Sequence, residues 1–470
     1  MTHDPILEPP HRGEGWRGEI AATLALAWPL VAANLAQMLV YAVDVIFVAR
    51  LGAETLAAAS LAVSLFGLVA WSLSGMTGMV AALIAAELGR RKHAVREVRR
   101  SARMGLWLAI AVGAVATVLM HFGEDIMLLT GQEPAVAARS GEFLQVLKWA
   151  MVPMLIANVL RSFVSALGRP IFATAITVLA IGVAVLGNYV FVFGHFGAPA
   201  MGMLGSPVST VVTSLFFVAA YIVAISSDRR LRRYRVFGKW WRPEWRRLRE
   251  LVRTGMPVSL TILAEAGLFS GAAFLMGRIG AEQLAGHTVA LQLAAFAFQV
   301  PFGVGQAATI RVGYFYGACD AAAIGRAGWT GIAIGTGFMV LTAGVMLFAP
   351  RFIIRLYVDP DAPQNVALVA FALRYMVVAA AFQLFDGIQA VSAGALRGVQ
   401  DTRVPMWIAL FGYWVPGLGT AVALGFFTPL QGTGIWIGLA IGLVVVAALL
   451  LQRWARRARL GLVSFSGVYP

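Results

Sequence analysis

The sequence predicts an all-α integral membrane protein with twelve transmembrane helices in two pseudo-symmetric six-helix bundles around a central cavity. Three observations support this fold class. The 470 residues are 60% apolar and only 13% charged, whereas soluble proteins carry about 25% charged residues. Twelve apolar stretches are long enough to cross a bilayer, which takes roughly 20 residues each. A repeat then relates the first six stretches to the last six.

The twelve candidate spans divide the chain into five parts. The spans lie at about 22–48, 56–85, 102–122, 138–162, 170–194, 202–226, 253–278, 285–310, 327–349, 370–396, 403–426 and 432–452. We therefore expect a cytoplasmic N-terminal tail at 1–21, an N-terminal six-helix bundle at 22–226, a basic cytoplasmic linker at 227–252, a C-terminal six-helix bundle at 253–452 and a basic cytoplasmic tail at 453–470.

The repeat has an offset of 228 residues. The segment LGAETLAAASLAVSL from Leu51 returns as IGAEQLAGHTVALQL from Ile279, and Pro29 returns as Pro257. An even number of spans in each half gives parallel repeats, related by an axis along the membrane normal. Transporters with repeats bind their substrate at the interface between the halves, which is where we expect the central cavity.

The basic residues predict the orientation. If both termini face the cytoplasm, thirty of the 37 Lys and Arg residues lie on that side, against seven on the other. This bias follows the positive-inside rule. Eleven of the thirty lie between Ser226 and Arg253, in a segment that we interpret as a hinge between the halves. The net charge of +15 is confined to short loops between apolar spans, so we do not expect nucleic acid as a partner. Residues 1–19 lack the features of a cleaved signal and are interpreted as a disordered tail.

Besides Glu142 near the start of the span 138–162, three acidic residues fall inside the predicted spans. Glu265 and Asp386 lie near the middle of spans 7 and 10, and Asp44 lies in span 1, nearer its outer end. A carboxylate near the bilayer centre costs roughly 3 kcal/mol. No Lys or Arg lies at comparable depth in these spans, so we expect a site for a proton, a metal cation or a cationic substrate. The structural alternatives are a helix cap near Arg50 for Asp44, and a basic partner or a permanently neutral state for the other two.

Uncharged side chains accompany these acids as candidates for the cavity lining. Gln37 occupies the position that matches Glu265 in the repeat, so one half has an amide where the other has the acid. An isolated Asn or Gln in a membrane span often forms a hydrogen bond between helices instead of binding a ligand. An aromatic residue there usually packs against other side chains. The candidates are Asn34, Gln37, Asn188, Phe269 and Tyr413.

Several signals of other functions are absent from the sequence. There is no G-x-x-x-x-G-K-[ST] loop for ATP, no H-E-x-x-H motif and no Cys/His cluster for zinc. The single cysteine, Cys319, cannot form an intrachain disulfide. We therefore expect a protein that is not an enzyme and that uses no bound cofactor.

Four motifs, in order and at their spacings, carry a family resemblance. They are Val43-Asp44-Val45-Ile46-Phe47 with Leu51-Gly52; Asn188-Tyr189 with Gly194, Gly197, Pro199, Gly202 and Gly205-Ser206; Glu265 with Phe269; and Asp386 with Gln389, Gly394, Leu396-Arg397-Gly398 and Asp401. With these motifs the chain, from about Trp28 to Gln452, resembles the multidrug and toxic compound extrusion family, in particular its NorM-type bacterial members.

The resemblance implies a function and a set of site residues. It implies a multi-pass protein of the bacterial inner membrane that exports organic, often cationic, small molecules against an inward flow of Na⁺ or H⁺, and we expect it to act as a monomer in the lipid bilayer. It implies that Glu265 and Asp386 form the cation site of the C-terminal half and are the tentative Na⁺ ligands. Asp44 and Asn188 would belong to the N-terminal half, where proton coupling is proposed for related subgroups.

Three other functions are alternatives to antiport. A lipid-linked oligosaccharide flippase of the same superfamily would need a cavity lined by Arg or Lys to hold pyrophosphate, and the spans are poor in both. A membrane-embedded enzyme would carry its acids or histidines in loops at one interface rather than in mid-span. A passive channel would show a repeated filter sequence, and none is present.

Overall fold

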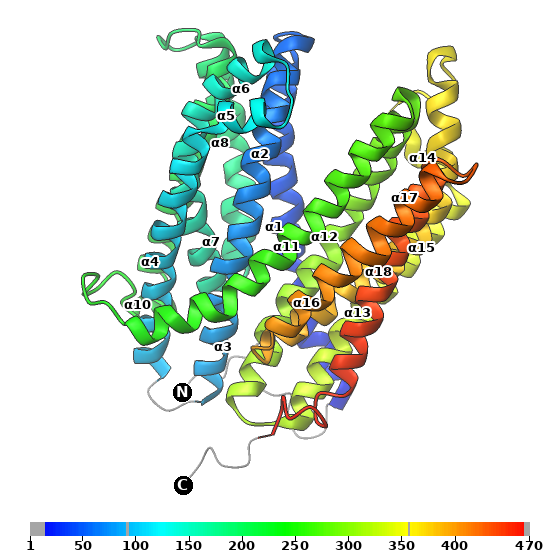
Figure 1. Ribbon diagram of the computed structural model, residues 1–470. Helices are drawn as coiled ribbons and strands as arrows, with labels where there is room; N and C mark the ends of the chain where they lie inside the picture. Colours follow the sequence, from blue (N-terminus) through cyan, green and yellow to red (C-terminus); the bar gives the residue numbers. More distant parts are fainter. Residues whose placement is uncertain (1–14, 91–93, 356–357, 465–470) are drawn as a thin grey trace. The chain divides into compact units, whose positions relative to one another are not determined.

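The computed structural model describes residues 15–90, 94–355 and 358–464, and every regular element within these ranges is a helix (Figure 1). Twelve of the helical segments are long and apolar enough to cross a membrane. The predicted all-α fold with twelve spans is thereby confirmed. Parts of the two predicted tails, 1–14 and 465–470, lie outside the described residues.

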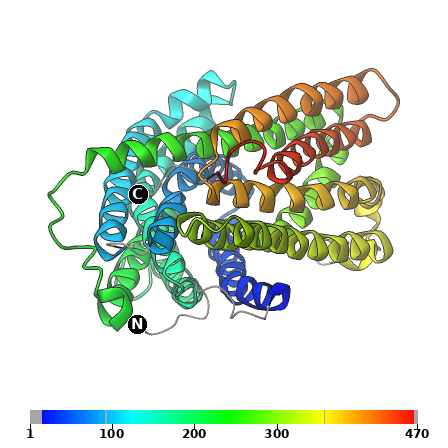
Figure 2. The same ribbon diagram turned by 90° about the horizontal axis from the view of Figure 1, so that it is seen from below.

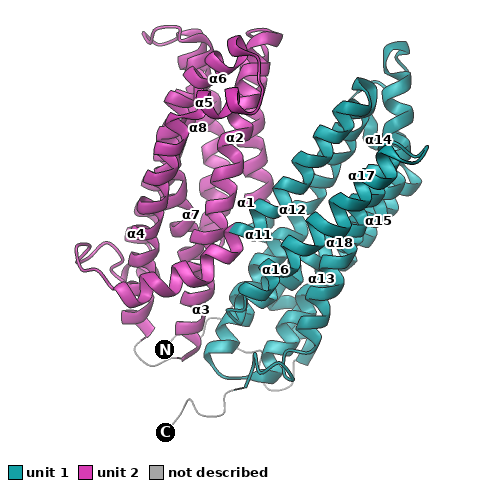
Figure 3. Ribbon diagram, in the orientation of Figure 1, with its two compact units in different colours: residues 1–31, 260–470 teal, residues 32–259 magenta. Residues whose placement is uncertain are grey.

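The chain divides into two compact units (Figure 3). Unit 1 contains residues 1–31 and 260–470, and unit 2 contains residues 32–259. This division differs from the predicted one, which cut the chain within the linker at 227–252. Each boundary instead falls inside a helix, two residues after the repeat-related Pro29 and Pro257. The whole linker therefore belongs to unit 2.

Unit 2 is built from the larger part of the first helix, the helices that follow it, and the start of α11. Its helices are α1 (Gly15–Ala49, from Ala32 on), α2 (Ala53–Gly78), α3 (Val80–Arg90), α4 (Ala94–His121), α5 (Gly123–Leu129), α6 (Pro134–Leu147), η1 (Lys148–Ala150), α7 (Met151–Ala166), α8 (Ile171–Phe193), η2 (Gly202–Leu204), α9 (Gly205–Ser227), α10 (Arg229–Arg232) and α11 (Trp245–Ile279, up to Ser259).

Unit 1 contains the start of α1, the rest of α11 and the helices that follow. They are α12 (Ala281–Gly317), α13 (Ala321–Phe348), α14 (Pro350–Ile354), η3 (Pro363–Asn365), α15 (Val366–Gly398), α16 (Arg403–Gly412), η4 (Tyr413–Leu418), α17 (Gly419–Phe426) and α18 (Gly432–Ala455). Shifted by the 228-residue repeat, α12 covers the same positions as α2 and α3 together.

The start of α1 corrects the prediction of a disordered tail. The helix begins at Gly15, so residues 15–21 are helical and do not belong to a tail. The physical reason is an ion pair that the sequence did not reveal. The Glu19 carboxylate accepts from Arg311 Nε at 2.5 Å and from Arg311 Nη2 at 2.9 Å, and both side chains are 1% exposed. This pair attaches the first turns of α1 to α12 within unit 1.

Unit 2 has a counterpart of this pair with the charges exchanged. Arg247, which lies 228 residues after Glu19, is in the first turn of α11 and contacts acids on two other helices of unit 2. Its Nη2 donates to Glu87 Oε1 at 2.6 Å and to Glu97 Oε2 at 3.0 Å. The first turns of α11 are thus attached to α3 and α4, as those of α1 are attached to α12.

The close approach of α12 and α15 positions the centre of unit 1. A methyl group on Gly394 would meet the Gly305 carbonyl oxygen at 2.4 Å, so only glycine fits there. The Thr309 hydroxyl donates across the same contact to the Gly394 carbonyl at 2.8 Å. Figure 2 shows the two helices running side by side. Because α15 also contacts α13 and α18, the side chain of Asp386 on α15 is buried.

Candidate functional site

In unit 2, Asp44 is held by two neutral hydrogen-bond donors. Asn188 Nδ2 on α8 donates to Asp44 Oδ1 at 2.7 Å, and Thr210 Oγ1 on α9 donates to Oδ2 at 3.0 Å. Asn188 is fully buried and also donates to the Ala184 carbonyl at 2.9 Å. The recorded partners of the Asp44 carboxylate are these two donors and not Arg50, whose guanidinium lies 5.7 Å from the centre of the Phe47 ring.

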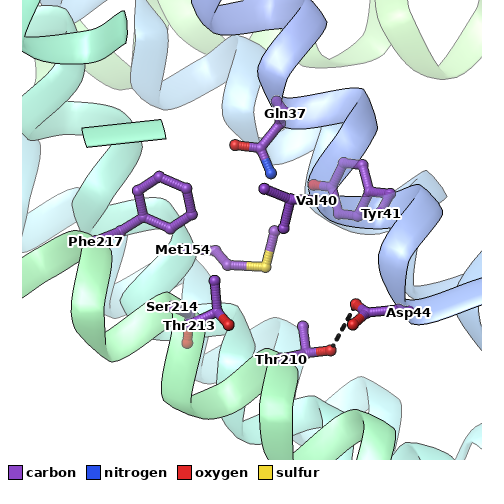
Figure 4. Close-up of a pocket in the computed structure, with 9 residues that line it drawn as sticks. All are labelled: Gln37, Val40, Tyr41, Asp44, Met154, Thr210, Thr213, Ser214 and Phe217. Atoms are coloured by element: carbon purple, nitrogen blue, oxygen red, sulfur yellow. Dashed lines mark hydrogen bonds between the residues drawn. The ribbon is translucent and has the colours of Figure 1, made fainter. Parts of the chain in front are cut away.

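Asp44 faces a small cavity within unit 2 (Figure 4). The cavity volume is about 20 Å³, which is room for about one water molecule. Gln37 and Asp44 both line it, as do two aromatic rings, so it combines one carboxylate with apolar and neutral polar groups. The lining residues are Gln37, Val40, Tyr41, Asp44, Met154, Thr210, Thr213, Ser214 and Phe217.

Asn34 forms a hydrogen bond with an arginine of α7. Its amide oxygen accepts from Arg161 Nη2 on α7 at 2.5 Å, and it does not line the cavity around Asp44. Arg161 also lies close enough to Tyr41 and Tyr221 for its charge to act on both hydroxyls. Arg161 lies inside α7, near the C-terminal end of that helix.

In unit 1, Glu265 on α11 and Asp386 on α15 lie close enough for their charges to interact. Asp386 is 4% exposed, and its Oδ1 has no hydrogen-bond partner within the described ranges. No ion pair or hydrogen bond to a described residue is formed by either carboxylate. A buried acid normally has such partners, so this pair is an unusual arrangement.

The expectation that Glu265 lacks a basic neighbour needs a correction. α15 continues to Gly398, so Arg397 is part of the helix rather than of the turn that follows, and its charge acts on Glu265. Arg397 lies eleven residues after Asp386, which is about three helical turns and places both on one face of α15. Arg397 forms no ion pair within 4 Å with Asp386 or with Glu265 in the described part of the chain. The guanidinium is a nearby charge and not a direct partner.

Tyr413 belongs to the surroundings of this acid pair. It is fully buried, and the charges of Glu265, Asp386 and Arg397 all act on its hydroxyl. That hydroxyl has no hydrogen-bond partner among the described residues. Tyr413 opens the π-helical segment η4, which also contains Pro416, and such bulges are frequent at functional sites.

A further oxygen near the pair comes from Gln389. This residue lies three positions after Asp386 on α15, on the same face of the helix. It is 3% exposed, and its Oε1 finds no partner in the described part of the chain. In the sequence Gln389 stands out only as part of a motif, because an amide in an apolar helix does not reveal whether its hydrogen bonds are satisfied.

Phe269 packs against other aromatic rings of unit 1. Its ring meets that of Phe382 edge to face, with the centroids 6.0 Å apart, and Phe382 packs in turn on Trp436 at 5.7 Å. His287 is also part of this aromatic cluster, 5.5 Å from Trp436. Through Phe382, the cluster covers the face of α15 one helical turn before Asp386.

The described residues contain no group of three or more His, Cys, Asp or Glu side chains that could hold a metal ion. The polar groups of the two units instead form two separate candidate sites, one around Asp44 and one around Glu265 and Asp386. Thr210, Arg161 and Tyr41 were missed by the sequence analysis. Only Thr210 carried a hint, as a hydroxyl in the span next to that of Asn188.

Comparison with known proteins shows the family. The MatE family model matches twice, at residues 29–190 and 257–422, and the two matches begin 228 residues apart. A "Probable multidrug resistance protein NorM" of Mesorhizobium japonicum is 45% identical over 445 residues, covering 95% of both chains. A protein with the same name from Brucella suis is 44% identical, covering 94% of both.

The fold is found in a solved structure, described as "Crystal structure of eukaryotic MATE transporter AtDTX14", with a TM-score of 0.84 at 21% identity. The similarity covers 95% of this chain and all of the other. At that identity the likeness shows the fold alone, and it agrees with the twelve spans seen here. The family model and the relatives together show that the chain belongs to the MatE family, as a NorM-type multidrug and toxic compound extrusion protein.

Proposed function

We propose that this protein is a secondary active antiporter that exports organic, amphipathic cations in exchange for Na⁺ by alternating access. The two halves would expose the substrate site to one side of the membrane at a time. The names of the relatives, which refer to multidrug resistance, support efflux of such compounds. Membership of a transporter family supports transport rather than catalysis.

The observation that carries the proposal is the acid pair of unit 1. Glu265 and Asp386 accept no hydrogen bond from the described residues, although Asp386 is buried. Leaving such a group unsatisfied costs about 1–3 kcal/mol, and more when it is charged. A cation that enters the site would remove this cost. The pair is therefore our candidate for the coupling-ion site.

Three unpaired oxygens favour Na⁺ over a proton in this proposal. A proton needs a single acceptor, whereas hard metal cations collect several oxygen ligands. Asp386 Oδ1, Gln389 Oε1 and the Tyr413 hydroxyl are all buried without a hydrogen-bond partner in the described ranges. Together with the Glu265 carboxylate they form an oxygen-rich donor set. H⁺ coupling is the alternative that the transport experiment below decides.

The cavity beside Asp44 is our candidate for the cationic end of the substrate. It offers one carboxylate among aromatic and apolar side chains, and aromatic rings attract organic cations. Its volume of about 20 Å³ is too small for an organic ion. Substrate binding there requires α1 and the facing helices to move apart, as a change of access state would do.

Coupling follows from linkage between the two sites. A bound cation shifts the balance of the two access states only through its different affinity for each of them. Cation and substrate then weaken each other's binding by the same factor. The energy comes from the Na⁺ gradient and from the membrane potential, which contributes about 2.3 kcal/mol per charge per 100 mV.

The test is transport in proteoliposomes on which Na⁺ and pH gradients are imposed separately. A Na⁺ gradient alone should drive efflux of a fluorescent organic cation, and Glu265→Gln or Asp386→Asn should abolish it. Glu282→Gln is the matched control, because Glu282 is an exposed acid on α12 without an ion pair among the described residues. Transport at wild-type rates by both site variants would refute the assignment. Transport driven only by the pH gradient would replace Na⁺ by H⁺.

The lipid-linked oligosaccharide flippase remains a second candidate because of one observation. Arg161 is an arginine inside unit 2, and its recorded hydrogen bond goes to a neutral amide, that of Asn34. A single guanidinium is a weak match for a pyrophosphate, which is normally held by several basic groups. An assay for flipping of a lipid-linked precursor in the same proteoliposomes distinguishes the two functions.

A further inference from the structure

The basic linker of unit 2 is fixed on α4 and is not a free hinge. Side chains of α4 donate to backbone carbonyls of the linker at three points: Arg99 to Tyr234 (2.6 Å), Arg103 to Lys239 (2.8 Å) and Trp107 to Trp240 (3.1 Å). The side chains of Leu231, Tyr234 and Val236 are buried. Figures 1 and 2 show this segment beside α4. The linker thus presents a fixed surface.

The acids near the linker are already paired with other groups. Arg247 contacts three of them, Glu87, Glu97 and Glu250. The other two are also engaged: Glu244 pairs with Arg100 at 3.2 Å and Asp228 with Arg169 at 3.6 Å. No acid of this region is therefore left to neutralise the outer basic groups.

The outer basic groups form a surface that we call the basic platform. Its seven members are exposed, and none has an ion pair to a described residue. They are Arg229, Arg232, Arg235, Lys239, Arg242, Arg246 and Arg249. Seven like charges on a fixed backbone repel one another and attract anions.

Exposed tryptophans lie among these charges. Trp241 is 72% exposed, Trp245 is 65% exposed and Trp240 is 36% exposed. The linker connects α9 to α11, both of which are long and apolar enough to span a membrane. The platform therefore lies where the hydrocarbon ends and the headgroups begin. Tryptophan is enriched at that depth because its indole is apolar with one polar N–H group.

We propose that the basic platform binds anionic phospholipids, with its guanidinium groups on the lipid phosphates and its indoles in the headgroup layer. Arginine suits this role because its planar guanidinium group can donate two hydrogen bonds to one phosphate. Nucleic acid would also be attracted by the charge, but it does not account for exposed indoles at a membrane boundary. Lipid binding goes beyond the transport function, and none of the platform residues belongs to either candidate site.

The experiment measures lipid selectivity of the full-length protein in nanodiscs that contain phosphatidylcholine and phosphatidylglycerol in equal amounts. The readout is the ratio of the two lipids retained by the protein, determined by native mass spectrometry. Because each basic group near an anionic surface adds to the free energy of lipid binding, the quadruple variant R229Q/R232Q/R242Q/R246Q should reduce the preference for phosphatidylglycerol by more than about tenfold.

The matched control removes four other charges. R50Q/R278Q/R351Q/R374Q changes exposed arginines outside the platform that have no ion pair with described residues, and it should keep the wild-type preference. Equal preference in wild type, platform variant and control would overturn the proposal. So would a preference that survives in the platform variant and is lost in the control.

Two further measurements need no folded quadruple variant. With wild-type protein, raising the salt concentration from 0.1 to 1 M shortens the screening length from about 10 to about 3 Å and should remove most of the preference. Unchanged selectivity in high salt would contradict an electrostatic site. Displacement of bound phosphatidylglycerol by single-stranded RNA at physiological salt would assign the platform to nucleic acid and likewise overturn the proposal.

Discussion

The two units surround their membrane-embedded acids in opposite ways. In unit 2, Asp44 accepts hydrogen bonds from Asn188 and Thr210, both uncharged donors supplied by the protein. In unit 1, Glu265 and Asp386 accept none from the described residues, although Asp386 is the more deeply buried acid. The repeat has preserved the helices, whereas the acids lie at positions that do not correspond: Gln37 stands where unit 1 has Glu265.

This difference indicates which acids need a ligand. A buried acid that already has its donors is stable by itself, whereas one without donors raises the free energy of the folded protein. Such unsatisfied groups persist where function requires them. The comparison therefore supports the proposal that the coupling cation binds in unit 1, whereas the hydrogen-bonded acid of unit 2 needs no coupling cation to be stable. The following predictions test this assignment, in order of decreasing expected effect.

The largest effect is expected from the cation itself. Na⁺ at 100 times its dissociation constant should stabilise the folded protein by about 2.7 kcal/mol. Glu265→Gln and Asp386→Asn should lose this stabilisation, and Asp44→Asn should keep it. Thermal unfolding in detergent, with choline chloride replacing NaCl at constant ionic strength, measures it. Loss of the Na⁺ effect in Asp44→Asn alone would reverse the roles of the two units.

Without Na⁺, the same substitutions should change stability with opposite signs. Asp44→Asn replaces one of the two acceptor oxygens by an amide NH₂, so either Asn188 or Thr210 loses its acceptor, and the free energy of unfolding should fall by about 1–3 kcal/mol. Asp386→Asn removes a buried carboxylate that lacks partners, so it should raise that free energy by about 1 kcal/mol. Unfolding curves of both variants in choline chloride provide the measurement. Equal destabilisation would show that the surroundings of the two acids are energetically alike.

Tyr413→Phe should separate binding from stability. The Tyr413 hydroxyl has no hydrogen-bond partner in the described part of the chain, so its removal should leave the unfolding midpoint in choline chloride unchanged. If this oxygen is a cation ligand, the dissociation constant for Na⁺ should rise by about tenfold, or about 1.4 kcal/mol. Na⁺ titration followed by thermal shift gives both values. An unchanged dissociation constant would exclude Tyr413 from the site.

The smallest effect should come from the second donor to Asp44. Thr210→Val removes the 3.0 Å hydrogen bond to Oδ2 and should cost about 1 kcal/mol. Thr210→Ser keeps the hydroxyl and should behave as wild type, which controls for the change in packing. Chemical or thermal unfolding in either salt is suitable, because this bond does not involve the cation. A Thr210→Val variant as stable as wild type would show that the remaining donor, Asn188, satisfies the acid alone.

Much of the architecture was predictable because membrane spans and repeats are patterns along the sequence, which need no knowledge of contacts between distant residues. Asp44, Glu265 and Asp386 stood out since a carboxylate in an apolar span is costly wherever it lies. The start of α1 was not predictable, because residues 15–19 read as polar sequence until Arg311, 292 positions away, is placed beside Glu19.

The partners of the acids were not predictable for the same reason. Thr210 and Asn188 lie 166 and 144 residues from Asp44, and hydroxyl and amide groups are common in membrane helices as packing contacts. The predicted span 370–396 ends directly before Arg397, because a basic residue near the end of an apolar run usually marks the membrane boundary. Only the length of α15 showed that it lies in the helix.

The opposite charges of Glu19 and Arg247 have a consequence for assembly of the chain. These residues occupy the same place in two similar halves, yet one must find Arg311 and the other Glu87. A misplaced α1 would bring Glu19 against Glu87, and a misplaced α11 would bring Arg247 against Arg311, each a repulsive encounter. The opposite charges therefore favour the correct pairing of the two similar N-terminal turns, those of α1 and α11, while the duplicated protein folds.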